Sequence, residues 1–184
     1  MSNRIKTVVL LGLILLSACV PTWQLTQEKP PSLKMFEVEL PESWLYLKDN
    51  SGKSIIASTD GPLIQRIFVG YETFDKAFAK TEREVTGDTL ISEVMDYYIA
   101  EVKASNAELV FESEEKSLVE VSENEGFRVI MAYKNAKGLR FKKEIIGTRN
   151  QDGMFFLAYD APVILYYEKS KPVFDDVVQS FKIL

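Results

Sequence analysis

The 184-residue chain contains no histidine and a single cysteine, Cys19. The absence of histidine excludes Ser-His-Asp and Cys-His catalysis, histidine metal sites and the usual general base near neutral pH. One cysteine cannot form an intramolecular disulfide or a zinc site built from several cysteines. These two shortages remove the commonest routes to nucleophilic catalysis and to a structural zinc module.

Positive charge is also scarce, because 22 Lys and Arg stand against 27 Asp and Glu and give a formal net charge of −5. Nucleic-acid binding draws most of its affinity from a basic surface, so we expect no nucleic-acid partner. The composition is otherwise that of a globular protein of one ordinary domain, with 46% hydrophobic and 27% charged residues.

The amino-terminal residues have the three-part organisation of an export signal. Two basic residues precede an apolar run over residues 8–16, and two small residues stand directly before Cys19. The run is shorter than the roughly 20 residues that a permanent membrane-spanning helix needs. A first helix of the fold would carry a polar face, and this run has none. We therefore expect residues 1–18 to be a signal peptide.

The residues Leu-Ser-Ala-Cys at positions 16–19 closely resemble the lipobox of bacterial lipoproteins. The resemblance implies that the Cys19 sulfur receives diacylglycerol, that cleavage occurs before Cys19, and that the new amino terminus is acylated with a fatty acid such as palmitate. Two or three acyl chains are enough for stable anchoring. Val20 stands where lipoproteins retained at the Gram-negative inner membrane typically carry aspartate. In a Gram-negative source we expect the outer membrane, on its periplasmic face.

The mature chain divides into a tether and one domain. Residues 19–33 contain three of the seven prolines and show no clean periodicity, which is typical of a linker. Strand and helix patterns begin after them, and we expect a single domain over residues 34–184. Removal of the signal peptide would take away Arg4 and Lys6 and no acidic residue, so the formal charge would change from −5 to −7.

Hydrophobic periodicity predicts an α+β fold. Residues 88–104 have one apolar stripe at helical spacing, and Thr86 or Asp88 is expected to cap this central helix. Further helices are expected to open at Ala161 and Pro172, with proline in the first turn. Five strand patterns follow the central helix, at residues 109–112, 116–121, 127–133, 139–147 and 154–159. Two of the connections between them end in glycine, as hairpin loops do. We expect an antiparallel sheet packed against the central helix and the C-terminal helices.

Two landmarks are similar to the PsbP-like fold, which also includes DcrB-like bacterial lipoproteins. Residues 36–44 give a strand, a proline and a tryptophan, and residues 174–182 give a helix that runs into Ser-Phe-Lys. The resemblance covers about residues 34–184. It implies a non-enzymatic module that docks on a larger partner, although a fold alone does not fix a function.

One expected hairpin carries a cluster of basic residues: Lys134, Lys137, Arg140, Lys142 and Lys143. In an acidic protein such a cluster indicates a docking patch for an acidic partner or an anionic surface. An ordinary solvated hairpin tip is the alternative interpretation.

Neighbouring aromatic residues offer a second candidate surface. Two adjacent side chains of a strand or helix cannot both face one core, so we expect some of Tyr97, Phe156 and Tyr166 to be exposed or to line a groove. The groove would suit a peptide or a lipid, whereas partial core packing would explain the same residues.

Enzymatic chemistry has few candidates left. Serine-lysine catalysis needs no histidine, and Ser113 and Lys116 have the S-x-x-K spacing, but acidic neighbours and flanking strand patterns favour a solvated segment. Asp49, Asn50 and Ser51 offer oxygen ligands for calcium but lack a closing bidentate glutamate, so we expect no metal site, and we expect no catalytic residue and no cofactor. Hydrolysis by carboxylates alone would need convergent acids in a cleft.

We therefore expect a lipid-anchored, non-catalytic envelope protein that acts as a binding or assembly module. Its partners would be the membrane, through the lipid, and an envelope protein. The alternative is a periplasmic carrier of a small apolar ligand or lipid. That ligand would lie between the sheet and the helix of residues 88–104, in a cavity lined by Tyr98, Met95 and strand aromatics.

Overall fold

The computed structural model describes residues 23–26 and 31–184. The expected signal peptide and Cys19 lie outside the described residues, and what the sequence indicates about them stays a prediction. Among the helices of the described part, none is long and apolar enough to cross a membrane.

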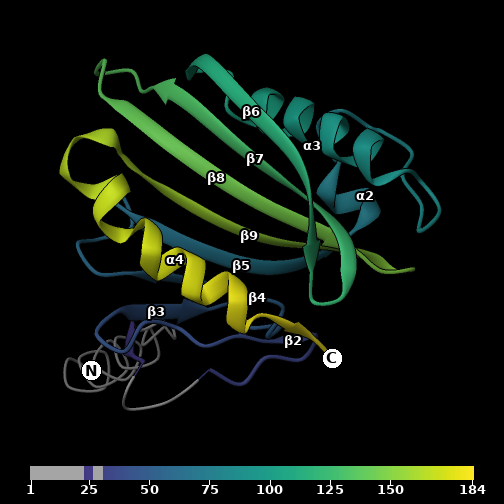
Figure 1. The fold of residues 1–184 in the computed structure, drawn as a ribbon, viewed down its shortest axis with the longest axis horizontal. Coiled ribbons are helices and arrows are strands. Elements are labelled where there is room, and N and C mark those ends of the chain that lie inside the picture. Colours follow the sequence, from purple (N-terminus) through teal and green to yellow (C-terminus); the bar gives the residue numbers. More distant parts are fainter. Residues whose placement is uncertain (1–22, 27–30) are drawn as a thin grey trace, which may run out of the picture.

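An antiparallel sheet of eight strands forms the centre of the domain (Figure 1). In their order across the sheet the strands are β1 (Gln24–Leu25), β3 (Leu45–Lys48), β4 (Ser54–Ser58), β5 (Arg66–Thr73), β9 (Gly153–Pro162), β8 (Arg140–Arg149), β7 (Asn124–Lys134) and β6 (Val110–Val121). A separate pair joins β2 (Phe36–Glu37) to β10 (Lys182–Ile183). This large antiparallel sheet with few helices confirms the α+β prediction.

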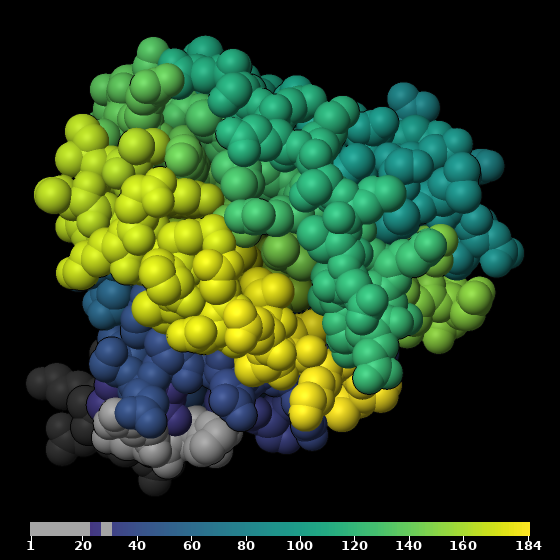
Figure 2. Space-filling model, in the orientation of Figure 1, coloured from purple at the N-terminus to yellow at the C-terminus, as the bar shows by residue number. Residues whose placement is uncertain are grey.

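Different elements cover the two faces of the sheet. Helix α3 (Ile91–Ser105) and the short α2 (Phe74–Ala77) pack on one side, called here the α3 face. Helix α4 (Glu168–Ser180) and the β2–β10 pair pack on the other, the α4 face. Figure 2 shows α4 and the C-terminal residues, in yellow, crossing the middle of the α4 face.

Strand β9 contributes to both cores because successive side chains of a strand point to opposite faces. Phe155 and Leu157 are buried against the α4 face, and Met154 and Phe156 are buried against the α3 face. The adjacent pair Phe155-Phe156 is therefore fully accommodated.

The expectation that some of Tyr97, Phe156 and Tyr166 are exposed or line a groove is met only in part, and the alternative of partial core packing fits better. Phe156 is buried, because the second helical layer gives it a core of its own. Tyr97 and Tyr166 are half-buried and pack at the margins of the two cores.

The central helix matches its predicted apolar stripe, but its predicted start and cap are wrong. Helix α3 begins at Ile91, directly after Leu90, and no side chain caps it. Thr86 is engaged elsewhere, because its amide donates to the Thr89 hydroxyl at 3.0 Å. Its own hydroxyl accepts from the Asp88 amide at 3.3 Å, so these residues form a turn before the helix.

Two other boundaries differ from the prediction. The two strand patterns at 109–112 and 116–121 belong to one strand, β6. A β-bulge between Phe111 and Ser113 shifts the register there and so interrupts the alternation of apolar and polar residues. Pro172 does not open a helix, since it lies inside α4. Ala161 belongs to β9, and the kinked segment η1 (Val163–Tyr167), whose backbone is not helical at Ile164 and Leu165, precedes α4.

The helix begins before Pro172 because tertiary contacts hold its first turn on the sheet. Ser170 is buried there, and the Lys171 ammonium lies 3.4 Å from the buried Glu144 carboxylate. Local propensity is a weak prior that such contacts override.

Part of the expected tether packs on the domain. Gln24 pairs with Tyr46 of β3, and the Tyr46 hydroxyl donates to its side-chain oxygen at 2.7 Å. The Thr26 hydroxyl lies 2.6 Å from the carbonyl oxygen of Pro41, to which it donates. Residues 23–26 are thus an edge of the sheet.

Candidate ligand-binding site

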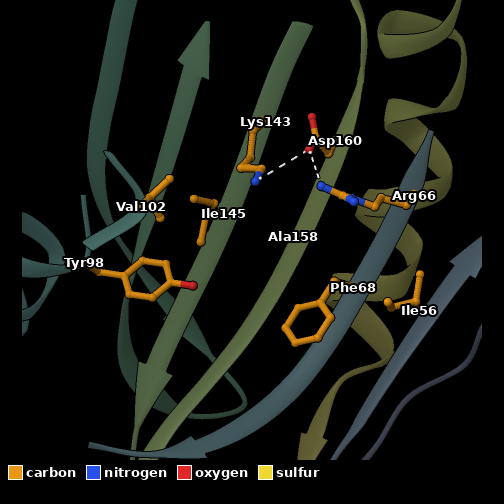
Figure 3. A pocket seen from close by; sticks show the side chains of 9 residues that line it. All are labelled: Ile56, Arg66, Phe68, Tyr98, Val102, Lys143, Ile145, Ala158 and Asp160. Atoms are coloured by element: carbon orange, nitrogen blue, oxygen red, sulfur yellow. Dashed lines mark hydrogen bonds and ion pairs between the residues drawn. The ribbon is translucent and has the colours of Figure 1, made fainter. Parts of the chain in front are cut away.

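A pocket of about 280 Å³ opens on the α3 face, between α3 and strands β5, β9 and β8 (Figure 3). Three charged side chains occupy one part of it, those of Arg66, Lys143 and Asp160. Tyr98 and five apolar side chains line the rest: Ile56, Phe68, Val102, Ile145 and Ala158. The site thus combines an apolar wall with a compact charged group.

Strand register brings the charged residues together. Asp160 on β9 stands opposite Arg66 of β5 on one side and opposite Lys143 of β8 on the other. Opposed positions in an antiparallel sheet project from the same face, about 5 Å apart. The three side chains therefore form a row across three neighbouring strands, and the two cations flank one carboxylate.

The Asp160 carboxylate is almost fully buried and accepts from several donors. Tyr133 donates its hydroxyl hydrogen at 2.7 Å, and the Arg66 guanidinium donates at 3.1 Å. Burial, with the negative charge of Asp160 beside it, raises the pKa of the Tyr133 hydroxyl above its ordinary value. The hydroxyl therefore stays protonated and keeps donating to the carboxylate at neutral pH.

Two other polar groups at the pocket lack a hydrogen-bond partner among the described residues. The Lys143 ammonium lies 3.6 Å from Asp160, close enough for an ion pair but beyond hydrogen-bond distance, and its side chain is only 17% exposed. The Tyr98 hydroxyl points into the pocket, while its ring stacks on Phe156 with centroids 4.1 Å apart. Burial, with the charges of Glu72 and Glu101, raises the Tyr98 pKa, so this hydroxyl is a neutral donor.

A second buried carboxylate, on the α4 face, has a structural explanation. Glu144 is 1% exposed and lies 2.7 Å from Arg128 Nε. It also accepts from the Tyr167 hydroxyl at 3.0 Å and pairs with Lys171. These donors come from β7, η1 and α4, so the cluster attaches the C-terminal helix to the sheet.

The five basic residues singled out in the sequence lie on the β7–β8 hairpin, as expected, but they do not form one patch. Lys134 and Arg140 both pair with Glu112 at 2.7 Å. Lys142 and Lys143 are adjacent on β8 and therefore point to opposite faces.

Lys142, Lys143 and Lys137 have different surroundings. Lys142 pairs with Glu168 of α4 at 3.3 Å, and only Lys143 reaches the pocket. Lys137 is exposed at the turn between the strands.

Tyr98 lines the pocket as expected from the sequence, whereas Arg66, Tyr133 and Asp160 were not expected there. Met95, which was also expected there, is buried in the core and does not line the pocket. A signal for Asp160 was present, since a carboxylate inside the apolar run of residues 153–162 needs partners when buried. Its partners could not be identified without the register, because Arg66 is 94 residues away.

Other candidate chemistry is not assembled in the described part of the chain. No group of three or more His, Cys, Asp and Glu residues there could hold a metal ion. Ser113 and Lys116 lie on β6 in an exposed stretch, where Lys116 pairs with Asp96 at 3.0 Å.

Comparisons with known proteins bear on the fold. No family model matches the chain, and no curated protein sequence matches it. Solved structures match at low identity. LpqN, involved in cell envelope biogenesis of Mycobacterium tuberculosis, has a TM-score of 0.53 at 15% identity, with 84% of this chain and 86% of LpqN covered. A Bacteroides thetaiotaomicron protein has a TM-score of 0.49 at 11% identity, and 81% of this chain spans 45% of that protein.

The cyanobacterial PsbP protein of Synechocystis, CyanoP, has a TM-score of 0.51 at 12% identity over 92% of this chain and 99% of CyanoP. At such identities the likeness concerns the fold. The chain therefore has an α+β fold similar to the PsbP-like fold of CyanoP.

Proposed function

We propose that the protein is a lipid-anchored, non-catalytic binding or assembly module of the bacterial cell envelope. The Leu-Ser-Ala-Cys motif supports lipidation of Cys19, and Val20 supports the periplasmic face of the outer membrane in a Gram-negative source. The PsbP-like fold and the absence of histidine support a role without catalysis. The observation that carries a binding role is an exposed apolar surface at one end of the sheet.

This surface, called here the loop end, is made by the loops 59–65, 106–109 and 135–139 together with η1 (Val163–Tyr167). The register places all four at one edge, since Arg66 stands opposite Asp160, Phe141 opposite Pro162, and Val110 opposite Lys134. In Figure 1 the β7–β8 and β4–β5 loops and the segment before α4 lie together on the left.

Large apolar side chains are exposed at the loop end. Leu63 is 90% exposed and Leu165 is 79% exposed, and four more apolar residues accompany them: Ile64, Val110, Leu139 and Ile164. Leu165 also has a positive φ of 72°, an uncommon conformation for a branched residue. Such gathered apolar exposure on a monomer marks an interaction site.

Charge at the loop end is balanced. Lys134, Lys137 and Arg140 carry three positive charges, and Asp60, Glu108 and Glu112 carry three negative ones. The exposed apolar side chains therefore distinguish this end more than its charge does. We propose an envelope protein with a complementary apolar patch as the partner.

Affinity capture of the full-length chain from solubilised membranes tests this docking surface. Leu63→Ser combined with Leu165→Ser should reduce recovery of a stoichiometric partner about tenfold or more, because truncation of an interface anchor costs about 2 kcal/mol or more. Leu118→Ser is the matched control, since Leu118 is exposed in the middle of β6, away from this end. Equal recovery with all three proteins, or recovery of the chain alone, would contradict the proposal.

A second candidate function is a carrier of a small apolar ligand in the periplasm. The pocket beside Tyr98 favours it, since it lies between α3 and the sheet. Its volume of about 280 Å³ is at the lower limit of ordinary ligand pockets, so a small molecule fits better than a whole lipid.

A further inference from the structure

We propose that the pocket on the α3 face binds a small amphipathic carboxylate, whose head is held by Lys143 and Arg66 and whose apolar body lies against Phe68 and Ile145. This inference deepens the second candidate function by naming the ligand's chemistry. It requires neither the lipid anchor nor a partner at the loop end.

The charges of the pocket favour an anion. Arg66 and Lys143 carry two positive charges and share the single negative charge of Asp160. The Lys143 ammonium is still reached by solvent, since no buried polar side-chain atom among the described residues lacks a hydrogen-bond partner. It has no hydrogen-bond acceptor within the described part of the chain, because its counter-ion Asp160 stands at 3.6 Å and receives hydrogen bonds from Tyr133 and Arg66. A second carboxylate would supply the missing acceptor.

The Arg66 guanidinium is suited to the same head group. Only one of its nitrogens, Nη2, donates to Asp160, and the side chain remains 43% exposed. Guanidinium has five N–H donors, and its planar fork matches the geometry of a carboxylate. Arg66 therefore has donors left for a ligand that enters from solvent.

The opposite wall defines the body of the ligand. Phe68, Ile145 and Val102 give an apolar surface next to the charged row, as Figure 3 shows. At about 30 Å³ per non-hydrogen atom, the share of a water molecule in the liquid, the pocket holds roughly nine such atoms. Heptanoate, with seven carbons and two oxygens, is a suitable probe.

Tyr98 adds a polar contact inside this apolar wall. Its hydroxyl points into the pocket and has no hydrogen-bond partner among the described residues. A ligand that carries a carbonyl or hydroxyl oxygen along its body would pair with it. Tyr98→Phe keeps the ring stacking on Phe156 and should leave heptanoate binding within about twofold, because heptanoate has no oxygen along its body.

Equilibrium dialysis of heptanoate against the full-length protein in phosphatidylcholine nanodiscs tests the site, with empty nanodiscs as the blank. We expect one heptanoate per chain, at least tenfold weaker binding by Lys143→Gln, and no competition by heptylamine. A lost hydrogen bond to a charged group accounts for a change of this size. Lys169→Gln is the matched control, since Lys169 is exposed on α4, on the other face of the sheet.

A second variant guards against loss of folding. Ala158→Leu fills the apolar part of the pocket without touching the charges, and it should abolish heptanoate binding while the urea unfolding midpoint stays near that of the parent. The proposal is overturned if heptan-1-ol binds as well as heptanoate, if Lys143→Gln and Lys169→Gln bind equally, or if the protein retains no more heptanoate than empty nanodiscs.

Discussion

At the residue scale, the most informative side chains are the carboxylates buried with their donors. Glu101, Glu144 and Asp160 are each less than 10% exposed, and each accepts from at least two groups. Removal of one donor leaves a buried carboxylate with fewer hydrogen bonds, which costs about 1 to 3 kcal/mol. Their donors come from distant segments, so these residues fix how the elements pack.

The buried hydroxyl of Tyr159 should make the free energy of unfolding depend on pH in alkaline solution. Burial raises the pKa of the Tyr159 hydroxyl from 10.0 to about 12. A hydrogen bond with Ser170 offsets part of this rise, and the negative charges of Asp160, Asp60 and Glu168 add to it. The folded state therefore holds this proton more tightly than the unfolded state does. The stabilisation is complete below pH 10 and is lost as the pH rises from 10 to 12, by about 2 to 3 kcal/mol.

Urea unfolding at a series of pH values checks this prediction. Tyr159→Phe should lower stability at pH 8 by about 1 kcal/mol, because the bond of its hydroxyl to the Tyr166 carbonyl is lost, and it should show a smaller decline above pH 10. The same decline in the variant and the parent would contradict the role given to Tyr159.

At the element scale, local patterns were enough to predict some features and not others. The stripe of α3 and the glycine-containing turns of the β7–β8 and β8–β9 hairpins depend on residues close in sequence, and both were predicted. The start of α4 was not, since Lys171 is held by Glu144 of another element.

The candidate site was less predictable than the fold. Tyr98 belongs to a helix whose periodicity is visible in the sequence, whereas the row Arg66, Asp160 and Lys143 depends on the pairing of β5 with β9. Nothing in the separate segments specifies that pairing. The basic hairpin residues were predicted correctly in position, yet strand alternation and pairing with Glu112 and Glu168 divide them.

The Glu101 side chain attaches residues 80 and 81 to helix α3. Its carboxylate accepts from the amides of Lys80 and Thr81 and from the Thr81 hydroxyl, at 2.8 to 2.9 Å for the shortest contacts. Glu101→Ala leaves these donors without their acceptor and should cost about 2 kcal/mol of unfolding free energy. Hydrogen exchange at the amides of residues 80 and 81 should become faster.

The exposed Glu93 of the same helix provides the control for this change. Glu93→Ala removes the same number of atoms and one charge but no described hydrogen bond, so it should alter stability by less than about 0.5 kcal/mol. If the two variants exchange at the same rates, Glu101 does not hold the segment.

At the scale of the whole molecule, anchoring is the property that separates an envelope module from a free domain. Cys19→Ser removes the sulfur that the lipobox resemblance requires, and we expect the variant to leave the membrane fraction. Mass spectrometry of the parent should give a mature chain that begins at Cys19 and carries acyl chains. A parent that begins elsewhere without acyl chains would contradict the proposed location, but not the ligand pocket.

The position of β9 has a consequence for the order in which the molecule is assembled. This strand pairs with β5 on one side and β8 on the other, so within the sheet of the described residues it joins four strands made early to the three strands β6, β7 and β8. A ribosome must synthesise nearly nine-tenths of the chain before that link exists. Until β9 is made, β5 and β8 each lack the strand that they pair with in the native sheet. Pairing between segments far apart in the sequence is slow. The β3–β4–β5 and β6–β7–β8 meanders can pair before β9 is made, so the late strand would join two preformed halves into one sheet.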